Sequence, residues 1–374
     1  MVDQFTSVVT KGYGSRIINS IKGIVVGLIL FVASFGVLFV NEGRVDQSKI
    51  AKKSLEISGS ELPRDKSEFF ASVTGPVTTE ESLGDGSMLL AGKYLSISKQ
   101  AEMYAWVEKA EEKSETSMGG SETTTTTYTY VKEWTAKPAD SSTFHESASH
   151  HNPPMTAVSG NYQVGTMKVG VYSLDGKSVS LPAGDKLPLT STMLALPVGA
   201  TIAGDAVYLN GASVSAPVIG DQRVSYSALT PGFQGTVFGK YMYGSSITKY
   251  TDDKGRGMDY RVFEGDRAAA LATMHGEFVM MLWLIRALGF LMMWIGLSMV
   301  LSPLAVILDF FPLLGSLGKM AINLLTFAIA VPLSLITIVI SAIVHNVVVL
   351  IVVISVSLAS LGYIFYKQWA SRKA

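Results

Sequence analysis

The sequence predicts an α+β membrane protein in which four transmembrane helices, one N-terminal and three C-terminal, carry a large, mainly β extracytosolic domain. Of the 374 residues, 48% are apolar and only 16% are charged, whereas charged residues make up about 25% of a typical soluble domain. The apolar excess lies in four runs, each close to the length that crosses a hydrocarbon layer. Between the first and second runs apolar and polar residues alternate, which is typical of half-buried strands.

The overall composition excludes several classes of function. The 30 Lys and Arg residues balance the 30 Asp and Glu residues, so no net charge attracts the chain to nucleic acid. We therefore expect no nucleic-acid partner. The chain has no Cys, which excludes disulfides, thiolate catalysis and thiolate metal sites.

The first apolar run, residues 24–40, is uncharged and follows a basic N-terminal segment. The run is long for the core of a signal peptide, and the polar sequence after it lacks the small residues of a cleavage site. We therefore predict an uncleaved signal anchor. A cytoplasmic segment covers residues 1–20, and the first transmembrane helix covers residues 21–40.

Three further apolar runs lie near the C-terminus. Pro332 lies inside the second of them, and we expect it to kink this helix rather than end it, because neighbouring helices can satisfy the carbonyl that proline frees. The predicted helices cover residues 287–308, 321–344 and 347–366, with a cytoplasmic loop over 309–320 and a cytoplasmic tail over 367–374.

The distribution of Lys and Arg sets the expected orientation, because cytoplasmic loops are enriched in these residues. With the N-terminus in the cytoplasm, four spans return the C-terminus to it, and the tight turn at His345 and Asn346 faces the other side. In a bacterium this places the protein in the inner or plasma membrane, with a periplasmic or extracellular domain. The basic residues on the cytoplasmic side are then Lys11, Arg16, Lys22, Lys319, Lys367, Arg372 and Lys373.

Residues 41–265 are predicted to form the extracytosolic β domain. Residues 99–109 alternate apolar and polar, and aromatic residues of one parity follow a Gly119-Gly120 turn, so the pattern predicts a long hairpin. Asn210-Gly211 is the best short hairpin-turn signal. Many short strands with turns between them are typical of a barrel or a sandwich, and the pattern leaves an OB-like barrel and an open sandwich as alternatives.

Residues 266–286 are predicted to form an amphipathic helix close to the membrane. Leu271, Met274, Phe278 and Leu282 recur at helical spacing. Such a helix either lies in the membrane interface or extends the next span outward, and the pattern favours neither.

Short motifs occur across nearly the whole chain. They contain Asn41, Glu42, Gly43, Arg44, Glu102, Tyr104, Trp106, Trp134, His150, Asn152, Pro153, Gly220, Asp221, Arg223, Asp309 and Pro312. In these motifs, in their order and in its arrangement of one plus three spans, the chain resembles the transmembrane protein 43 family, also called LUMA, as a prokaryotic-type member.

This resemblance implies a multi-pass protein whose large domain lies in the lumen, the periplasm or outside the cell. In eukaryotes the family resides in the endoplasmic reticulum and inner nuclear membrane, self-associates, and helps to organise complexes that involve emerin and lamins. Roles in innate signalling and channel-like currents have been proposed for it. Only membrane organisation can transfer to a cell without a nuclear envelope, and the family supplies no catalytic residues.

One His-rich cluster is a candidate for metal binding. Glu146 and His150 stand four residues apart, as a metal pair on a helix would, but the Ser, Asn and Pro residues around them favour a loop. We therefore predict a turn whose imidazole bonds the backbone, with no metal and no cofactor. Glu42 with Arg44, and Asp221 with Arg223, are read as local ion pairs.

A polar stripe runs along the predicted third span, because its members are spaced by threes, fours or their sums. Small polar side chains on one face normally pack against other membrane helices. A pore lining is the alternative, although spans three and four have no ionisable residue in their cores, and ion pathways usually have one. The stripe comprises Asn323, Thr326, Ser334, Thr337 and Ser341, and Gly23 and Gly27 form a second packing candidate in the first span.

Three functional hypotheses follow. The leading one is a non-enzymatic integral membrane scaffold that forms a homo-oligomer and binds an unidentified membrane or extracytosolic protein, with the lipid bilayer as its surroundings. The second is an oligomeric channel or membrane-perturbing effector. The third is an extracytosolic hydrolase centred on His150, which requires an open cleft with a carboxylate or hydroxyl beside the imidazole.

Overall fold

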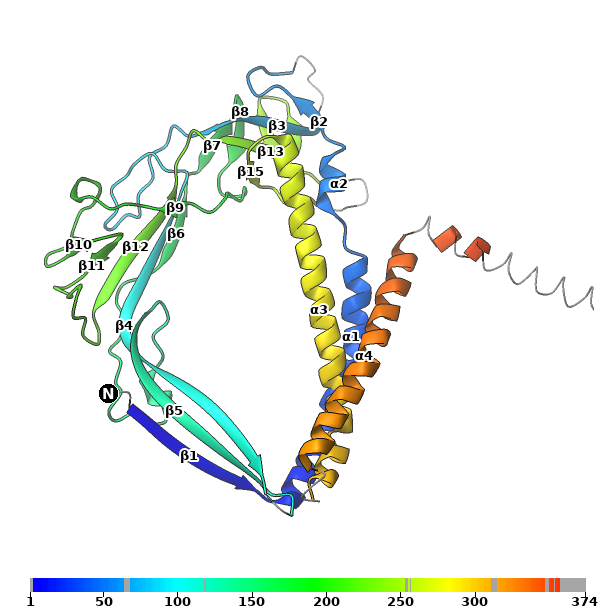
Figure 1. Cartoon of the computed structure of the whole chain (residues 1–374). Coiled ribbons are helices and arrows are strands. Elements are labelled where there is room, and N and C mark those ends of the chain that lie inside the picture. Colours follow the sequence, from blue (N-terminus) through cyan, green and yellow to red (C-terminus); the bar gives the residue numbers. More distant parts are fainter. Residues whose placement is uncertain are drawn as a thin grey trace, which may run out of the picture. The chain divides into compact units, whose positions relative to one another are not determined.

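The computed structural model describes residues 3–63, 68–117, 119–252, 255, 257–310, 315–346, 350–352 and 354–356. The chain divides into two compact units, coloured along the sequence in Figure 1. The β unit comprises Met1–Ser7, Asp46–Glu111 and Thr126–Gly276, and the helical unit comprises Val8–Val45, Glu112–Thr125 and Glu277–Ala374. The division therefore passes through three strands and one helix.

Within the described residues, one sheet has eight strands, in the order β1-β5-β4-β12-β11-β10, with β6 paired to β4 and β9 to β12. In β4 the side chains of Ala101, Met103 and Ala105 are fully buried while the residues between them are not, which confirms the alternation read from the sequence. The strands are β1 (Asp3–Lys11), β4 (Ser96–Thr116), β5 (Glu122–Thr135), β6 (Gly160–Gln163), β9 (Asp185–Lys186), β10 (Thr201–Ala203), β11 (Ala206–Tyr208) and β12 (Gln222–Leu229).

Two turn predictions had different outcomes. The turn between β4 and β5 contains Gly119 and Gly120, both with positive φ, as the sequence predicted. Asn210 and Gly211 also have positive φ, but they belong to the longer connection from β11 to β12. The two-residue hairpin turn is instead Gly204-Asp205, because Ala203 pairs with Ala206. The prediction of a two-residue turn at Asn210 was wrong, because β11 ends at Tyr208 and β12 begins only at Gln222.

Five strands of the second sheet close into a ring. β3 pairs with β7 and β13, β7 with β8, and β13 with β14, and β8 and β14 close the ring as a parallel pair. A closed five-stranded Greek-key barrel of this kind is the OB-fold architecture, so this part matches the OB-like alternative. The strands are β2 (Leu55–Ile57), β3 (Phe69–Thr78), β7 (Thr166–Val169), β8 (Tyr172–Asp175), β13 (Gln234–Met242), β14 (Ser246–Thr248) and β15 (Val262–Glu264).

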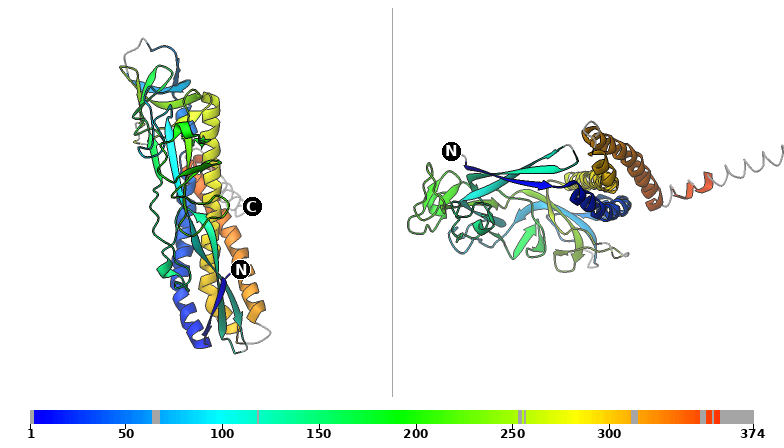
Figure 2. Two further views of the ribbon diagram at one scale, coloured as in Figure 1. Left: turned by 90° about the vertical axis from the view of Figure 1, so that its left-hand side faces the viewer. Right: turned by 90° about the horizontal axis from the view of Figure 1, so that it is seen from below.

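Three helices in the described part of the chain are long and apolar enough to cross a membrane. They include α1 (Tyr13–Glu42), α3 (Arg267–Leu308) and α4 (Gly315–His345), and their parts within the helical unit lie side by side in Figure 2. α4 continues through Pro332, as predicted. A short helix, α2 (Gln47–Ala51), and two 3-10 turns, Ser141–Thr143 and Ser191–Met193, complete the helical elements described here.

The helices differ from the predicted boundaries in two places, and the fourth span is largely undescribed. Residues 3–11 form a strand, and α1 then begins at Tyr13. The predicted amphipathic helix and second span form one helix of 42 residues, about 63 Å long, which is twice the thickness of a hydrocarbon core. Of the predicted fourth span and tail, only residues 350–352 and 354–356 are described, as helix; the rest lies outside the described residues.

A buried ion pair anchors the eight-stranded sheet. Lys99 Nζ donates to Asp85 Oδ2 at 2.8 Å, and the Tyr226 hydroxyl donates to the same oxygen at 2.7 Å. The other oxygen accepts three backbone N–H groups from residues 87–89. Burial alone would raise the pKa of Asp85, but the Lys99 ammonium, the donors at Ser87 and the Tyr226 hydroxyl outweigh it and hold this pKa well below its usual range.

We predict that Asp85→Asn lowers the free energy of unfolding by about 3 kcal/mol at pH 7, because it leaves Lys99 buried without its partner. A lowered folded-state pKa contributes stability above the unfolded value of about 3.9 and loses it as the pH falls through the folded value. The free energy of unfolding of the β unit, measured with denaturant, should therefore fall less steeply below about pH 4 in Asp85→Asn than in the parent. Asp185→Asn, at an exposed carboxylate, is the control.

Candidate functional site

Two glycines allow α1 and α3 to cross in close contact. A Cβ added to Gly27 would lie 2.7 Å from the Gly296 carbonyl oxygen, and one added to Gly296 would lie 2.7 Å from the Gly27 carbonyl oxygen. Gly23 is one turn away, and the nearest atom to its added Cβ is Ser302 Oγ at 3.9 Å. Of the two predicted packing glycines, Gly27 is therefore at the helix contact and Gly23 is beside it.

The polar stripe of α4 is divided between helix contacts and its own backbone. The Thr326 hydroxyl is 2.8 Å from the Ser298 hydroxyl of α3, and the Ser341 hydroxyl donates to the Phe39 carbonyl of α1 at 2.8 Å. Ser334 and Thr337 donate to carbonyls within α4. Asn323 is exposed on the described surface, and its backbone carbonyl accepts from the Trp294 indole of α3.

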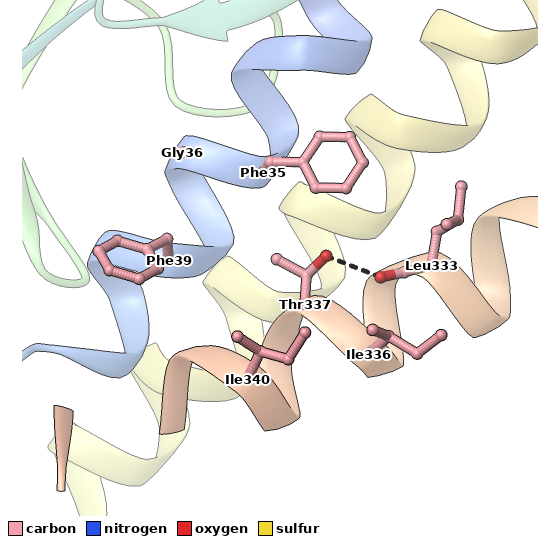
Figure 3. Close-up of a pocket in the computed structure, with 7 residues that line it drawn as sticks. All are labelled: Phe35, Gly36, Phe39, Leu333, Ile336, Thr337 and Ile340. Atoms are coloured by element: carbon pink, nitrogen blue, oxygen red, sulfur yellow. Dashed lines mark hydrogen bonds between the residues drawn. The ribbon is translucent and has the colours of Figure 1, made fainter. Parts of the chain in front are cut away.

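An open apolar groove of about 500 Å³ lies between α1 and α4. In Figure 3 the Thr337 hydroxyl is bonded to the Leu333 carbonyl, so it offers little polarity to the groove. The groove suits aliphatic chains, whether from lipid or from another helix. It is lined by Phe35, Gly36, Phe39, Leu333, Ile336, Thr337 and Ile340.

The motif at the C-terminal end of α1 joins this helix to α3 and α4. Asn41 Nδ2 donates to the Leu282 carbonyl of α3 at 3.0 Å. Glu42 receives two bonds of 2.8 Å from Arg286, and its side chain is 5% exposed. A Cβ on Gly43 would lie within 2.6 Å of two ring atoms of His345, so this glycine gives room to the end of α4.

Both ion pairs predicted between near neighbours were wrong. Arg44 is exposed, and Glu42 binds Arg286 from α3 instead. Arg223 binds Glu102 on the neighbouring strand at 2.7 Å, whereas the Asp221 carboxylate accepts the Val218 amide. In both cases the carboxylate or the guanidinium pairs with a charge on an adjacent helix or strand. The opposite charge two residues away in the same segment does not form the pair.

A second charged cluster lies at the opposite end of α1. Arg16 Nη2 is 2.5 Å from Asp309 at the end of α3 and 3.3 Å from Glu122 at the start of β5. Lys319 of α4 lies 3.2 Å from Asp309 and 3.8 Å from Glu122. Arg16 is 7% exposed and Asp309 3% exposed. Two cations thus balance two carboxylates, which offsets the cost of burying Arg16 and Asp309.

Backbone and polar groups of the β4–β5 hairpin complete this cluster, which we call the Arg16 cluster (Arg16, Glu122, Asp309 and Lys319). Arg16 Nη1 also donates to the Gly120 carbonyl, and Lys319 Nζ donates to the Thr116 hydroxyl at 3.1 Å. All these residues belong to the helical unit. Of the family-motif residues at this end, Asp309 is in the cluster, and Pro312 lies outside the described residues.

His150 is enclosed by aromatic rings in the β unit. Its ring stacks on Tyr130 at 3.8 Å and meets Trp106 edge-on at 4.6 Å. Nδ1 lies 3.0 Å from the Glu146 carbonyl, and Nε2 lies 3.6 Å from Asp3 Oδ2. The residue is 1% exposed, so no substrate reaches the ring, and this geometry gives the hydrolase hypothesis no support.

The remaining motif residues gather around β4. Asn152 bonds both backbone groups of Trp106, and Arg223 stacks over the Trp134 ring at 4.5 Å. Tyr104 packs against the same Trp134 ring, with centroids 5.5 Å apart. Gly220 has φ of 96°, and its added Cβ would lie 2.8 Å from Pro153. These residues hold strands and loops together, and within the described residues no group of three or more His, Asp or Glu side chains could hold a metal ion.

Comparison with known proteins identifies the family of this chain. The sequence profile of the Transmembrane protein 43 family matches residues 103–347, more than half of the chain. The chain belongs to the transmembrane protein 43 family. This confirms the resemblance seen in the motifs, and together with three apolar helices in the described part it identifies a multi-pass integral membrane protein.

Family relatives extend from mammals to insects. The chain is 25% identical to Transmembrane protein 43 of Rattus norvegicus over 353 residues, which cover 89% of this chain and 87% of the rat protein. The human protein is 25% identical over 347 residues, covering 87% and 85% of the two chains. The Drosophila melanogaster homolog is 27% identical over 241 residues, covering 61% and 63%. No solved structure matches significantly.

Sequence reasoning missed three participants in these contacts. Arg286 and Gly296 lie on α3 without any local motif to mark them. Glu122 belongs to a hairpin that was assigned to the extracytosolic domain, so its contact with Arg16 was not expected. The signal that could have found Arg286 is a lone charge at the edge of an apolar run, which requires a partner.

We predict that Gly27→Ala destabilises the helical unit by about 1–3 kcal/mol, the usual cost of overpacking, because its Cβ meets backbone atoms of α3. Gly23→Ala is the matched control and should remain within about 0.5 kcal/mol of the parent. Unfolding of purified protein in detergent, followed by helical circular dichroism, measures both. Equal losses from the two changes would contradict the proposed helix crossing.

We also predict that Glu42→Arg and Arg286→Glu each lower the free energy of unfolding by about 3 kcal/mol, since each leaves an unpaired, largely buried charge. The double variant should recover at least half of this loss, because it restores the pair in the reverse direction. Arg44→Glu, at an exposed residue, should change the free energy of unfolding little. Additive losses in the double variant would count against a direct pair.

Proposed function

We propose that this chain is a non-enzymatic membrane scaffold that self-associates and organises protein complexes in its membrane. Assembly uses the β unit outside the cytosol and lateral packing of the helices. The observation that carries this proposal is a set of exposed apolar side chains on two loops beside a sheet edge of the β unit that is free in the described structure.

That edge is β10, the last strand in the order of the eight-stranded sheet. Free edges invite pairing with another chain, and soluble surfaces normally avoid clustered apolar residues beside them. The Gly211 amide bonds the Gly199 carbonyl, so the loop before β10 and the loop after β11 are joined. These two loops expose Leu196, Val198, Val214 and Val218, and Val198 is fully exposed.

The helical unit supports lateral packing better than a pore along α4. Thr326 and Ser341 use their hydroxyls on α3 and α1, which is the usual role of such residues in lipid. The groove between α1 and α4 remains open on the apolar surface. A second helix or lipid chains would fill it in a membrane.

The orientation is part of this proposal. Arg16 and Lys319 lie near the first residues of α1 and α4, and Lys22 lies further along α1. The enrichment of Lys and Arg on the cytoplasmic side favours placing these helix ends in the cytosol. The Asn41–Arg44 end of α1 then faces outward. The β unit follows Val45 directly in the chain and is assigned to the same outer side.

Cross-linking in native membranes tests the scaffold. We expect products of two or more copies, and we expect Val198→Lys with Val214→Lys to reduce their yield several-fold, because two ammonium groups must be desolvated in the interface. Val158→Lys is a matched control, since Val158 is 72% exposed but lies outside the two loops. A protein that remains strictly monomeric and without partners at native abundance would refute the proposal.

A further inference from the structure

The tip of the β4–β5 hairpin, residues 112–117 and 119–125, lies at the Arg16 end of the helical unit. Gly120 and Glu122 bind Arg16, and Thr116 binds Lys319. Figure 1 shows this tip beside the start of α1 and the end of α3. The tip therefore lies on the same side of the membrane as the first turn of α1.

The two ends of α1 must lie on opposite sides. Residues 24–40 carry no charge, and the side of the helix away from the buried Gly27 and Leu38 exposes large apolar side chains, among them Val25, Val26 and Val32. An apolar helix face of this kind is stable when hydrocarbon covers it. Arg16 and Arg44 then lie on opposite sides of the bilayer.

The path of the chain now requires two additional crossings. It leaves α1 on the Arg44 side and reaches the hairpin tip on the Arg16 side, then returns to begin α3, whose far end at Asp309 is again beside Arg16. Within the described residues, no apolar helix able to span lies between α1 with its extension to Ala51 and Arg267. The undescribed residues in this interval, 64–67, 118, 253–254 and 256, are too few to form a span. The arms of the hairpin themselves must make the crossings.

β1 makes a third arm. Asp3 lies 3.6 Å from His150 in the β unit, whereas the Thr10 hydroxyl is 3.2 Å from the Thr123 hydroxyl at the tip. The strand then leads directly to α1 at Tyr13. The 24 residues of α1 between Arg16 and Asn41 rise about 36 Å along the helix axis. A strand covers the same distance with about 11 residues, and both β4 and β5 are longer than this.

These arms cannot face lipid. A strand in hydrocarbon must have all its backbone groups paired and its charges neutralised, yet residues 109–117 of the hairpin are exposed on both faces. Six charged residues fall within eight positions of β4: Glu108, Lys109, Glu111, Glu112, Lys113 and Glu115.

We infer that the ribbon of β1, β4 and β5 crosses the depth of the membrane inside a water-filled enclosure whose lipid-facing wall is formed by the helices of neighbouring copies. The inference rests on the proposed self-association, which supplies the neighbouring helices. The acidic excess of the arms makes the enclosure more favourable for small cations than for anions.

Single cysteines test this inference, and the chain has no native Cys to interfere. A charged, membrane-impermeant thiol reagent is applied to intact cells and to inverted vesicles. Gly14→Cys reports the Arg16 end, Gly204→Cys reports the β unit, and Ser121→Cys reports the tip. Two further variants compare the reaction rate of the ribbon with that of the lipid-facing helix inside the membrane. They are Ala110→Cys, at an exposed residue of β4, and Val32→Cys, at an exposed residue of α1.

We expect Ser121→Cys to react from the same side as Gly14→Cys and from the side opposite to Gly204→Cys. Ala110→Cys should react about 100-fold faster than Val32→Cys, the ratio that the cost of a charge in hydrocarbon implies. Reaction of Ser121→Cys only from the Gly204 side would overturn the inference, as would an Ala110→Cys that is as protected as Val32→Cys.

Self-association is scored separately, by cross-linking the same single-cysteine proteins. Cross-linked oligomers with a tip on the Gly204 side would refute the ribbon crossing and leave the scaffold intact. A monomer with the expected labelling would refute the enclosure by neighbouring copies, while the sidedness of the tip would stand on its own.

Discussion

Hydrocarbon does not tolerate unpaired charge, and the helical unit is organised around this constraint. Among the residues that the structure describes, its charge pairs with buried members lie at the two ends of α1. Arg16 meets Asp309 and Glu122 at one end, and Glu42 meets Arg286 at the other. Between these ends the helices contact one another through glycines and hydroxyls, which satisfy their bonds locally or across the helix pair. The ion pairs therefore fix the register of three helices without placing charge in lipid.

Buried polar groups in the β unit also have bonding partners. Asp85 collects three backbone amides, the Lys99 ammonium and the Tyr226 hydroxyl, so a buried carboxylate links a loop to two strands. His150 sits among aromatic rings with its Nδ1 directed to a backbone carbonyl. Both groups are buried, and neither faces an open cleft in the described part of the chain. Structural bonding accounts for them more simply.

How much the sequence could predict depended on the range of each interaction. Periodicity located the apolar helices and the alternation of Ala101, Met103 and Ala105, because burial on one face leaves a local signature. Residues at 3–11 carry too weak a pattern to be distinguished from a terminal segment, and their pairing to β5 depends on a partner more than 100 residues away. The same limit explains the wrong partners for Glu42 and Arg223. Charge neutralisation requires an opposite charge nearby in space, and sequence spacing identifies it only within one helix or turn.

The family motifs can be understood in these terms. Asn41, Glu42 and Gly43 join α1 to α3 and α4, Asp309 joins α3 to α1, and Trp106 with Asn152 ties a loop to β4. Each motif lies where two elements far apart in the chain must meet, and none lines a reactive cleft in the described structure. These contacts hold the helices and strands together. The hairpin tip takes part in them, because it supplies the Gly120 carbonyl and the Glu122 carboxylate to Arg16.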